Sequence, residues 1–526
     1  MDTKALRQKI LDLAIRGQLV PQDPNDEPAS VLLDRIRAEK QKMVKEGKLK
    51  AKDIKNDSVI FVGEDNLHYE KFANGSVRCI EDEIPFDLPE GWAWSRIKNI
   101  ASIGTGATPL KSNTEYYVGG KISWITSAAT CDNIIKSATD YITELAVQET
   151  NCQIYPVGTL VVAMYGEGKT RGQISELGIA ACTNQACAAI QVWGGNAGVS
   201  QLVKMFFSYN YENIRMKAKG GQQPNLNQSI IAETLIPIPP ENEIMRLLDF
   251  SHTCLNEIQV ITENKERTFQ LANQARTKIL DLAIRGKLVP QDPNDEPASV
   301  LLERIRAEKE ELIKQGKIKR DKKESVIFRG EDNSYYEKID GKVLCIDDNI
   351  PFEIPESWAW CRGYSCFEGM TSIKPQDEFF DYIDIDAIDN RNHCIKEAKR
   401  LPVSKTPSRA SRAVKSGSVL FSLVRPYLEN IALVEEERSH CIASTGFYIC
   451  NSNGVFLPEF MFFLMVSRYV VNGLNQYMKG DNSPSISKDN IENWLYPVPP
   501  LEEQKTICFK LKDAFSAIER MEKSLS

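Results

Sequence analysis

The chain has 526 residues, of which 42% are hydrophobic and 26% charged, a composition typical of a globular protein with more than one domain. No run of 18 apolar residues predicts a membrane span, and the charged N-terminal residues predict no secretory leader, so we expect a cytoplasmic protein. Thirteen cysteines without a Cys-x-x-Cys pair and four scattered histidines argue against a disulfide framework and against metal chemistry. The net charge of −7 excludes a uniformly basic nucleic-acid binder, but not one with a basic face.

The first predicted elements are an amphipathic helix over 4–16 and a charged helix over about 27–47, and this stretch is repeated later. Residues 9–40 match 278–309 at 30 of 32 positions, the exceptions being Gln18/Lys287 and Asp34/Glu303. Three further pairs of segments match: 58–71 with 325–338, 84–94 with 350–360, and 223–243 with 483–503. Between Trp94 and Gly220, and between Trp360 and Gly480, the copies diverge almost completely. We call the matching segments on either side of each divergent part the frame. The repeat therefore indicates two readers of the same kind with different targets.

The divergent parts predict α+β domains. Short β-rich runs such as "KISWIT", "GTLVVAMY" and "IAACTNQACAAIQVW" are separated by Gly, Asn, Ser and Pro turns, and a helical segment over 200–218 precedes the end of the first domain. The second copy has the same order, with "FFDYIDIDAI", "GSVLFSLVR" and "IASTGFYIC" before a helical segment over 459–478. These patterns do not predict a doubly wound nucleotide-binding fold.

One motif within the first domain resembles a phosphate-binding loop. "LVVAMYGEGKT" ends in Gly168-Lys169-Thr170, but a working loop needs a helix directly after the threonine. Gly172 and Gly178 interrupt the following residues, and the aligned second copy has Arg425 and Pro426 instead. We therefore interpret the segment as a hairpin tip that carries Lys169 and Arg171 and can reach DNA phosphates.

A long amphipathic helix is predicted over 241–286, where apolar residues recur every three or four positions and proline is absent. Its counterpart is 501–526, completed by 4–16 from the other end of the chain. Such helices can pack as an antiparallel pair, either only to hold the protein together or also to dock a partner. The C-terminus stops near the repeat position at which the N-terminus begins, so the chain corresponds to a ring cut once within a helix. We expect the two termini to lie side by side.

The frame motifs "IPFDLPEGWAW", "GTGATP", "QPNLNQSIIAETLIPIPPENE" and "KILDLAIRGKLVPQDPNDEPA" resemble the specificity subunit of type I restriction-modification systems. The resemblance covers the whole chain. It implies an α+β protein with two target-recognition domains separated by long antiparallel helical spacer regions, in a pseudo-two-fold, circularly permuted tandem repeat. The implied division is 1–57 (N-terminal helical region), 58–240 (first recognition domain with its leading hairpin), 241–324 (central spacer), 325–500 (second recognition domain with its hairpin) and 501–526 (C-terminal spacer helix).

The resemblance further implies a chain that is not itself an enzyme and that reads a bipartite double-stranded DNA site, one half-site per domain. It would direct two methyltransferase subunits to adenine N6, and restriction subunits to unmodified DNA. S-adenosylmethionine, ATP and magnesium belong to those partners, and no cofactor is expected in this chain. The absence of an Asp/Asn-Pro-Pro-Tyr/Phe motif from the sequence agrees with that division of labour.

We expect polar and basic loop residues of the divergent domains to contact DNA, since specificity should lie where the copies differ. In the first domain these are Lys111, Ser112, Asn113, Tyr116, Lys169, Arg171, Lys217, Lys219, Gln222 and Gln223. In the second domain they are Lys374, Arg391, Asn392, Lys405, Arg409, Arg412, Arg425, Lys479 and Asn482. Each could instead be a solvated surface residue. Trp92, Trp94, Trp358 and Trp360 belong to the repeated frame and are expected to pack in the core.

Two other functions fit parts of the sequence. A nucleotide hydrolase built on Lys169 is opposed by the missing helix and by the second copy. A non-enzymatic coiled-coil adaptor with two protein-binding heads suits the acidic net charge and the helical segments.

Overall fold

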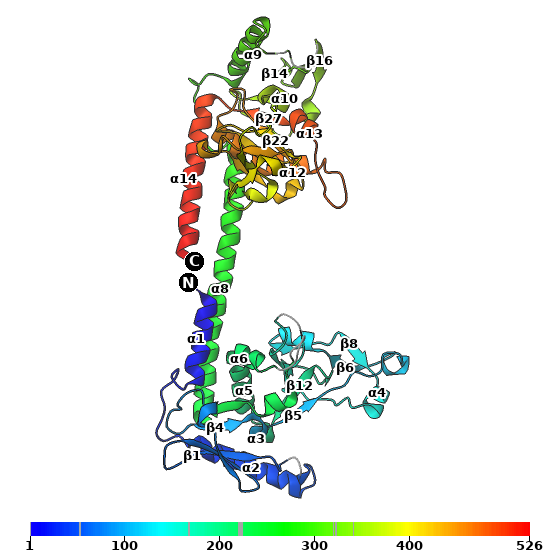
Figure 1. The fold of residues 1–526 in the computed structure, drawn as a ribbon, viewed down its shortest axis with the longest axis vertical. Coiled ribbons are helices and arrows are strands. Elements are labelled where there is room, and N and C mark those ends of the chain that lie inside the picture. The colour runs from blue at the N-terminus through cyan, green and yellow to red at the C-terminus, as the bar shows by residue number, and fades with distance from the viewer. Residues whose placement is uncertain are drawn as a thin grey trace. The chain divides into compact units, whose positions relative to one another are not determined.

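The computed structural model describes residues 2–51, 54–166, 169–218, 225–318, 320, 323–339 and 341–525. The chain forms two compact units, Met1–Asn264 and Lys265–Ser526. Both units contain helices and sheets, so the predicted α+β class is confirmed (Figure 1). No helix in the described ranges is long and apolar enough to cross a membrane.

Unit 1 opens with the repeated frame. Helices α1 (Thr3–Ile15) and α2 (Ala29–Lys45) precede an antiparallel sheet of β1 (Ser58–Val62), β2 (His68–Phe72) and β3 (Val77–Cys79). Strand β4 (Ala93–Arg96) then pairs with β13 (Leu235–Ile238), which follows the divergent domain in the sequence. The frame segments before and after the divergent domain are therefore joined by this pair of strands.

The divergent domain of unit 1 contains two sheets. Five strands are ordered β5 (Ala101–Thr105), β12 (Cys187–Val192), β9 (Leu160–Ala163), β10 (Ile174–Leu177) and β7 (Ile134–Ile135). A smaller sheet contains β11 (Cys182–Thr183), β6 (Ile122–Ile125) and β8 (Asp140–Ile142). The helices are α3 (Ile97–Ile100), α4 (Glu144–Glu149), α5 (Ala197–Tyr209), α6 (Tyr211–Met216) and α7 (Gln228–Ala232). Leu202, Val203 and Phe206 of α5 are buried in the core that covers the larger sheet.

Unit 2 repeats the frame with α9 (Ala298–Lys314), β14 (Ser325–Arg329), β15 (Tyr335–Ile339), β16 (Lys342–Cys345), and the pair β17 (Ala359–Arg362) and β27 (Leu495–Val498). Its divergent domain has one sheet of β21 (Lys399–Pro402), β18 (Phe379–Ile383), β25 (Ile442–Ser444) and β22 (Ala410–Ala413). A second sheet has β24 (Ile431–Leu433), β23 (Val419–Ser422) and β26 (Phe447–Cys450), beside the short pair β19 (Ile388–Asp389) and β20 (Cys394–Ile395). The helices are α10 (Gly363–Cys366), α11 (Pro458–Met465), α12 (Arg468–Asn475) and α13 (Lys488–Asn493).

Each unit contains an antiparallel pair of long helices. Helix α8 (Glu241–Ile284) gives its first part to unit 1, where Ile244 and Leu247 share a hydrophobic core with Leu11 and Ile15 of α1. Its last part belongs to unit 2, where α14 (Leu501–Leu525) packs beside it and Arg276 forms two hydrogen bonds of 2.8 and 2.7 Å with Glu522. The helices predicted over 241–286 and 501–526 are thus present. Ser526 lies outside the described residues.

A glycine sits at the corner after the first helix of each frame. Gly17 has a φ of +66°, and a Cβ there would lie 2.5 Å from Pro89. Gly286 has a φ of +67°, and its Cβ would lie 2.4 Å from Pro355. The left-handed backbone and the close approach both require glycine, which fixes the helix against the strand that opens each divergent domain.

Candidate DNA interface

In unit 1 the segment that resembles a phosphate-binding loop is a hairpin. Strands β9 and β10 pair antiparallel, with Val162 opposite Ile174, and the N–H of Gly172 donates to the carbonyl of Ala163 at 2.8 Å. No helix follows Thr170, because β10 begins at Ile174. The predicted hairpin tip is confirmed at Lys169 and Arg171, whereas the preceding residues 167–168 lie outside the described part of the chain.

Side chains of helix α6 hold this hairpin through hydrogen bonds to its backbone. The hydroxyl of Tyr211 donates to the carbonyl of Lys169, and the guanidinium of Arg215 donates to the carbonyl of Arg171 at 3.4 Å. Arg215 also lies over the Tyr211 ring, 5.0 Å from its centroid. Lys217 follows α6 directly, so the structure places Lys169, Arg171 and Lys217 on one supported loop cluster. We call it the unit 1 loop cluster.

Sequence reasoning missed Tyr211 and Arg215. Their spacing of four residues within a helical segment is the signal that could have found them, since such residues share one helix face. Lys219, Gln222 and Gln223, which were predicted to complete this cluster, lie outside the described residues.

The remaining unit 1 candidates lie after β5. Asn113 caps the short helix η3 (Thr114–Tyr116) by accepting from the N–H of Glu115 at 3.1 Å. The hydroxyl of Tyr116 donates to Glu149 at 3.0 Å, a hydrogen bond that raises the pKa of Tyr116. These two side chains therefore have local partners, while Lys111 and Ser112 are exposed.

In unit 2 the equivalent loop contains Arg425, a non-glycine residue in the left-handed region with a φ of 48°. Its N–H donates to the carbonyl of Pro484 at 2.8 Å, and its guanidinium donates to the carbonyl of Asn482 at 3.0 Å. Lys479 and Ser485 exchange backbone hydrogen bonds of 3.0 Å, which closes this segment into a hairpin. Arg425, Lys479 and Asn482 are thus brought together and are all exposed; we call them the unit 2 loop cluster.

A second turn joins the unit 2 loop cluster. The carboxylate of Asp389 accepts from the backbone N–H groups of Arg391 and Asn392 at 3.0 and 3.2 Å, and these hydrogen bonds lower the pKa of Asp389. The side chain of Asn390 donates to the carbonyl of Leu428 at 2.8 Å, three residues after Arg425. The turn is therefore fixed beside the cluster, with Arg391 and Asn392 exposed.

The other unit 2 candidates are more dispersed. The carbonyl of Arg409 accepts from the N–H of Thr445 at 2.8 Å. The residue after Thr445 is Gly446, whose carbonyl accepts from the N–H of Leu423 at 2.8 Å, two residues before Arg425. Arg412 is half-buried, and Lys405 is exposed at the end of the short helix η8 (Val403–Lys405). Lys374 lines a different pocket, together with Asp381 and His440.

The same backbone contact anchors both clusters to the frame. In unit 1 the N–H of Leu226 donates to the carbonyl of Met164 at 3.1 Å, and in unit 2 the N–H of Ile486 donates to the carbonyl of Leu423 at 2.9 Å. Each donor lies just before α7 or α13, and each acceptor lies just after β9 or β23. Two equivalent positions on one repeated scaffold thus present different polar side chains. The two units therefore share one scaffold and differ in the polar side chains that it carries.

Comparison with known proteins identifies the class further. Residues 89–267 match the family model described as the type I restriction modification DNA specificity domain. The specificity subunit of the type I restriction enzyme EcoAI from Escherichia coli is 26% identical over 98% of this chain and 90% of that protein. The EcoEI specificity subunit from the same species is 26% identical over 99% of this chain and 90% of that protein.

Solved structures give matches of lower overall similarity. The HsdS subunit from Thermoanaerobacter tengcongensis is 34% identical over 33% of this chain and 46% of that chain, with a TM-score of 0.31. The type I S subunit from M. genitalium is 14% identical over 84% of this chain and 95% of that chain, with a TM-score of 0.30.

Over nearly its whole length the chain is similar to specificity subunits of type I restriction enzymes, and residues 89–267 carry the DNA specificity domain. It is a sequence-specific DNA-recognition subunit and not itself an enzyme.

Trp92, Trp94, Trp358 and Trp360 are all buried, as predicted, with exposed fractions of 9, 3, 5 and 1%. They therefore stabilise the frame and are not available for stacking on DNA bases.

Proposed function

We propose that the chain reads a bipartite DNA sequence, one half-site per unit, through the two loop clusters. In this proposal residues 58–240 and 325–500 are target-recognition domains, each with its leading hairpin. Residues 1–57, 241–324 and 501–526 would form antiparallel helical spacer regions of a pseudo-two-fold, circularly permuted repeat.

One observation carries the proposal: the two units hold equivalent loops by the same backbone hydrogen bond but place different side chains on them. Leu226 to Met164 and Ile486 to Leu423 fix the loops, and the exposed groups are then Lys169 in one unit and Arg425 in the other. A shared scaffold with different polar tips is what two readers of different half-sites need.

The side chains suit DNA. Lysine and arginine can contact phosphates or the acceptor edge of guanine, and asparagine or glutamine can pair with adenine. The nineteen residues predicted from the sequence stay the proposed contact set, with Lys169, Arg171, Lys217, Arg391, Asn392, Arg425, Lys479 and Asn482 the best supported, because backbone contacts gather them into two clusters.

The proposal extends to partners. Two methyltransferase subunits with S-adenosylmethionine would methylate an adenine N6 in each half-site, and an adenine must leave the base stack for that reaction. Restriction subunits with ATP and magnesium would cleave unmodified DNA. The assembly would act in the cytoplasm.

Genome-wide mapping of N6-methyladenine, in cells with and without the gene, tests the proposal. A bipartite motif that loses methylation on deletion is expected. Exchange of residues 95–219 for the corresponding domain of a relative with a different target should then change only one half of the motif. Methylation that persists unchanged after deletion would contradict the proposed function and favour a protein-binding adaptor.

A further inference from the structure

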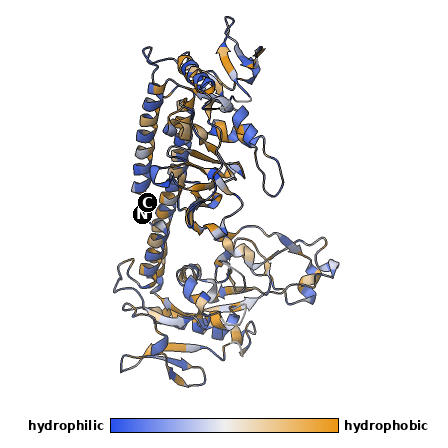
Figure 2. Ribbon diagram, turned by 45° about the horizontal axis from the view of Figure 1, so that its top comes forward, coloured by the Kyte–Doolittle hydropathy of each residue, from blue (hydrophilic) through white to orange (hydrophobic). Residues whose placement is uncertain are grey.

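The three-stranded sheet in each unit has an outer face that is largely exposed to solvent. Because side chains alternate along a strand, this face carries Val59, Phe61, Tyr69, Lys71, Val77 and Cys79 in unit 1. The same face in unit 2 carries Val326, Phe328, Tyr336, Lys338, Val343 and Cys345. Figure 2 shows hydrophobic residues within the strands of both sheets.

The two outer faces are identical at every position. Strand pairing aligns Phe61 with Tyr69 and Tyr69 with Cys79 in unit 1, and Phe328, Tyr336 and Cys345 form the same row in unit 2. The aromatic rings stack with centroids 5.9 Å apart in unit 1 and 6.0 Å apart in unit 2. A second row, Val59–Lys71–Val77, is repeated as Val326–Lys338–Val343.

The inner faces of the same sheets have diverged. Four of their positions differ between the copies: Val62/Arg329, His68/Tyr335, Phe72/Ile339 and Arg78/Leu344. Two of these differing positions, Val62/Arg329 and Arg78/Leu344, are exposed to solvent in both units, like most of the outer face. Exposure alone therefore does not explain why the outer face has kept all six residues while positions on the opposite face changed.

The retained residues include apolar side chains that are exposed to water, which is energetically unfavourable. Phe61 is 41% exposed and Val77 is 52% exposed, and Phe328 and Val343 are 42% and 52% exposed. An exposed apolar patch of this kind marks an interaction site. Within the described ranges Lys71 and Lys338 make no ion pair, so each patch also offers one cation to a partner.

The patch is held in a fixed shape. The hydroxyl of Tyr69 donates to Asp65 at 2.7 Å, and that of Tyr336 donates to Asp332 at 2.8 Å. On the inner side Glu70 binds Arg96 of β4. Since β4 pairs with β13 after the divergent domain, this ion pair connects the sheet to the frame strands that flank the loop cluster.

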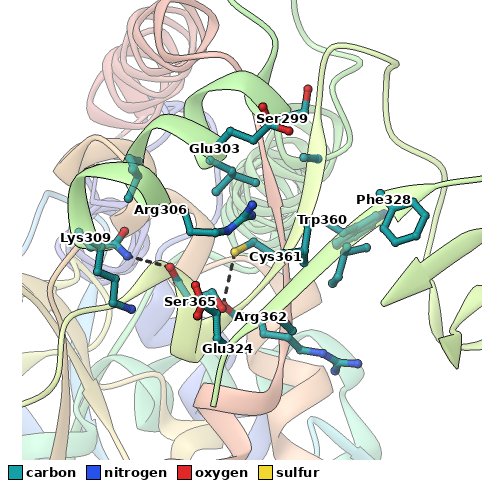
Figure 3. Close-up of a pocket in the computed structure, with 17 residues that line it drawn as sticks. Ser299, Glu303, Arg306, Lys309, Glu324, Phe328, Trp360, Cys361, Arg362 and Ser365 are labelled. Atoms are coloured by element: carbon teal, nitrogen blue, oxygen red, sulfur yellow. Dashed lines mark hydrogen bonds between the residues drawn. The ribbon is translucent and has the colours of Figure 1, made fainter. Parts of the chain in front are cut away.

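A small hollow lies where each three-stranded sheet meets the helix and the strand of its frame. In unit 2 it has a volume of about 110 Å³ between α9, β14 and β17, with Arg306 and Trp360 in its lining and Phe328 at its edge (Figure 3). In unit 1 a hollow of about 60 Å³ lies between α2, β1 and β4, lined by the equivalent Arg37 and Trp94. The repeated surface thus includes a recess that can take one partner side chain.

We propose that this outer face, with its adjoining hollow, is the docking surface for the methyltransferase subunit, one copy on each unit. The inference rests on the proposed function. Two identical surfaces require the same partner twice, and the reaction that needs one partner per half-site is adenine methylation. The partner surface would present apolar side chains and an acidic group for Lys71 or Lys338.

The native cysteines of the face test this proposal without any substitution. Cys79 and Cys345 are exposed on the outer face, whereas Cys131 and Cys394 are exposed within the divergent domains. The full chain is treated with N-ethylmaleimide, without DNA, in the presence and absence of the purified methyltransferase subunit of the same system. Cys79 and Cys345 should be protected, and Cys131 and Cys394 should react as before.

Substitutions test the same contact by stoichiometry. Phe61→Asp should leave one methyltransferase subunit bound, Phe328→Asp should also leave one, and the double variant should leave none. Each substitution should weaken the affected site about 30-fold, as expected for an apolar anchor at an interface. Val62→Arg and Leu67→Ser are matched controls, because they introduce the residues that unit 2 already has, and both should retain two subunits.

The outcomes separate this inference from the proposed function. Two bound subunits on the double variant, or unprotected Cys79 and Cys345 in the complex, would overturn the docking surface while the bipartite reading stands. Loss of restriction subunits alone, with two methyltransferase subunits retained, would also overturn it. A wild-type chain that binds no methyltransferase subunit would contradict the proposed function itself.

Discussion

Trp92 donates its indole N–H to the carboxylate of Glu243 over 3.1 Å, although 151 residues separate the two in the sequence. Trp358 and Glu503 repeat the contact in the second unit at 2.8 Å. Burial raises the pKa of both glutamates more than their hydrogen bonds lower it. Each pair joins the first turn of α8 or α14 to the residue directly before the strand that opens the divergent domain, so the domain and that helix are fixed at one point.

Trp92→Phe should destabilise unit 1, because a smaller aromatic ring is kept but the buried Glu243 carboxylate loses a donor. The expected cost is about 1–3 kcal/mol in the free energy of unfolding, measured by urea denaturation. Trp358→Phe should have the same effect in unit 2. Trp193→Phe is the matched control, since its indole N–H has no acceptor within the described residues. An equal cost for Trp193→Phe would mean that ring packing, rather than the hydrogen bond, is responsible.

The frame could be predicted from the sequence because it is written twice. The long helices, the hairpin at Lys169 and Arg171, and the buried tryptophans followed from periodicity and from comparison of the copies. The predicted β-rich run "IAACTNQACAAIQVW" contains two strands. It divides into β11 and β12, since the N–H of Asn184 donates to Ile125 and its side chain accepts from Ala186.

The gathering of site residues could not be predicted in the same way. Tyr211 reaches Lys169 across 42 residues, and Arg425 reaches Asn482 across 57. Such contacts depend on how the sheet folds back on itself, and neither local spacing nor the second copy encodes them. The identity of the two outer sheet faces was present in the sequence, but it has meaning only once strand pairing divides the residues between faces.

The ion pair between Glu70 and Arg96 should make stability depend on acid pH. Burial would raise the pKa of Glu70, but hydrogen bonds from Arg96 and Ser58 outweigh it and lower the pKa from its ordinary value of 4.5 to about 2. Because the folded-state pKa is depressed, the contribution is fully present above pH 4.5 and is lost as the pH falls towards about 2.

Glu70→Gln should remove that dependence and cost about 3 kcal/mol at neutral pH, since it leaves a buried arginine with fewer partners. Urea denaturation at a series of pH values between 7 and about 2.5 measures both effects. Glu64→Gln, in the exposed turn of the same sheet, should leave the profile unchanged. A Glu70→Gln profile as steep as that of the wild-type chain would show that other carboxylates dominate acid unfolding.

Substitutions in the loop clusters should affect the two half-sites separately. On a duplex that carries the mapped motif, Lys169→Ala should weaken binding of the assembled methyltransferase complex by roughly tenfold and reduce the dependence of log affinity on log salt by about 1, as for a lost phosphate contact. Arg425→Ala should act on the other half-site, where base changes would then discriminate less. Lys42→Ala, exposed on α2 of the frame, is the control. Equal losses for all three variants would argue for nonspecific attraction.

Lengthening α8 should change the spacing of the half-sites but not their sequences. Four residues inserted after Asn264, at the division between the two units, add about one helical turn, or roughly 6 Å at 1.5 Å per residue. If α8 is part of the spacer, the mapped motif should keep both half-sites and gain nonspecific base pairs between them, about two at 3.4 Å each. Insertion of the same residues after Gly47, in the exposed turn that follows α2, should leave the motif unchanged. An α8 insertion that abolishes methylation while the chain stays folded and keeps both partners would contradict the spacer role.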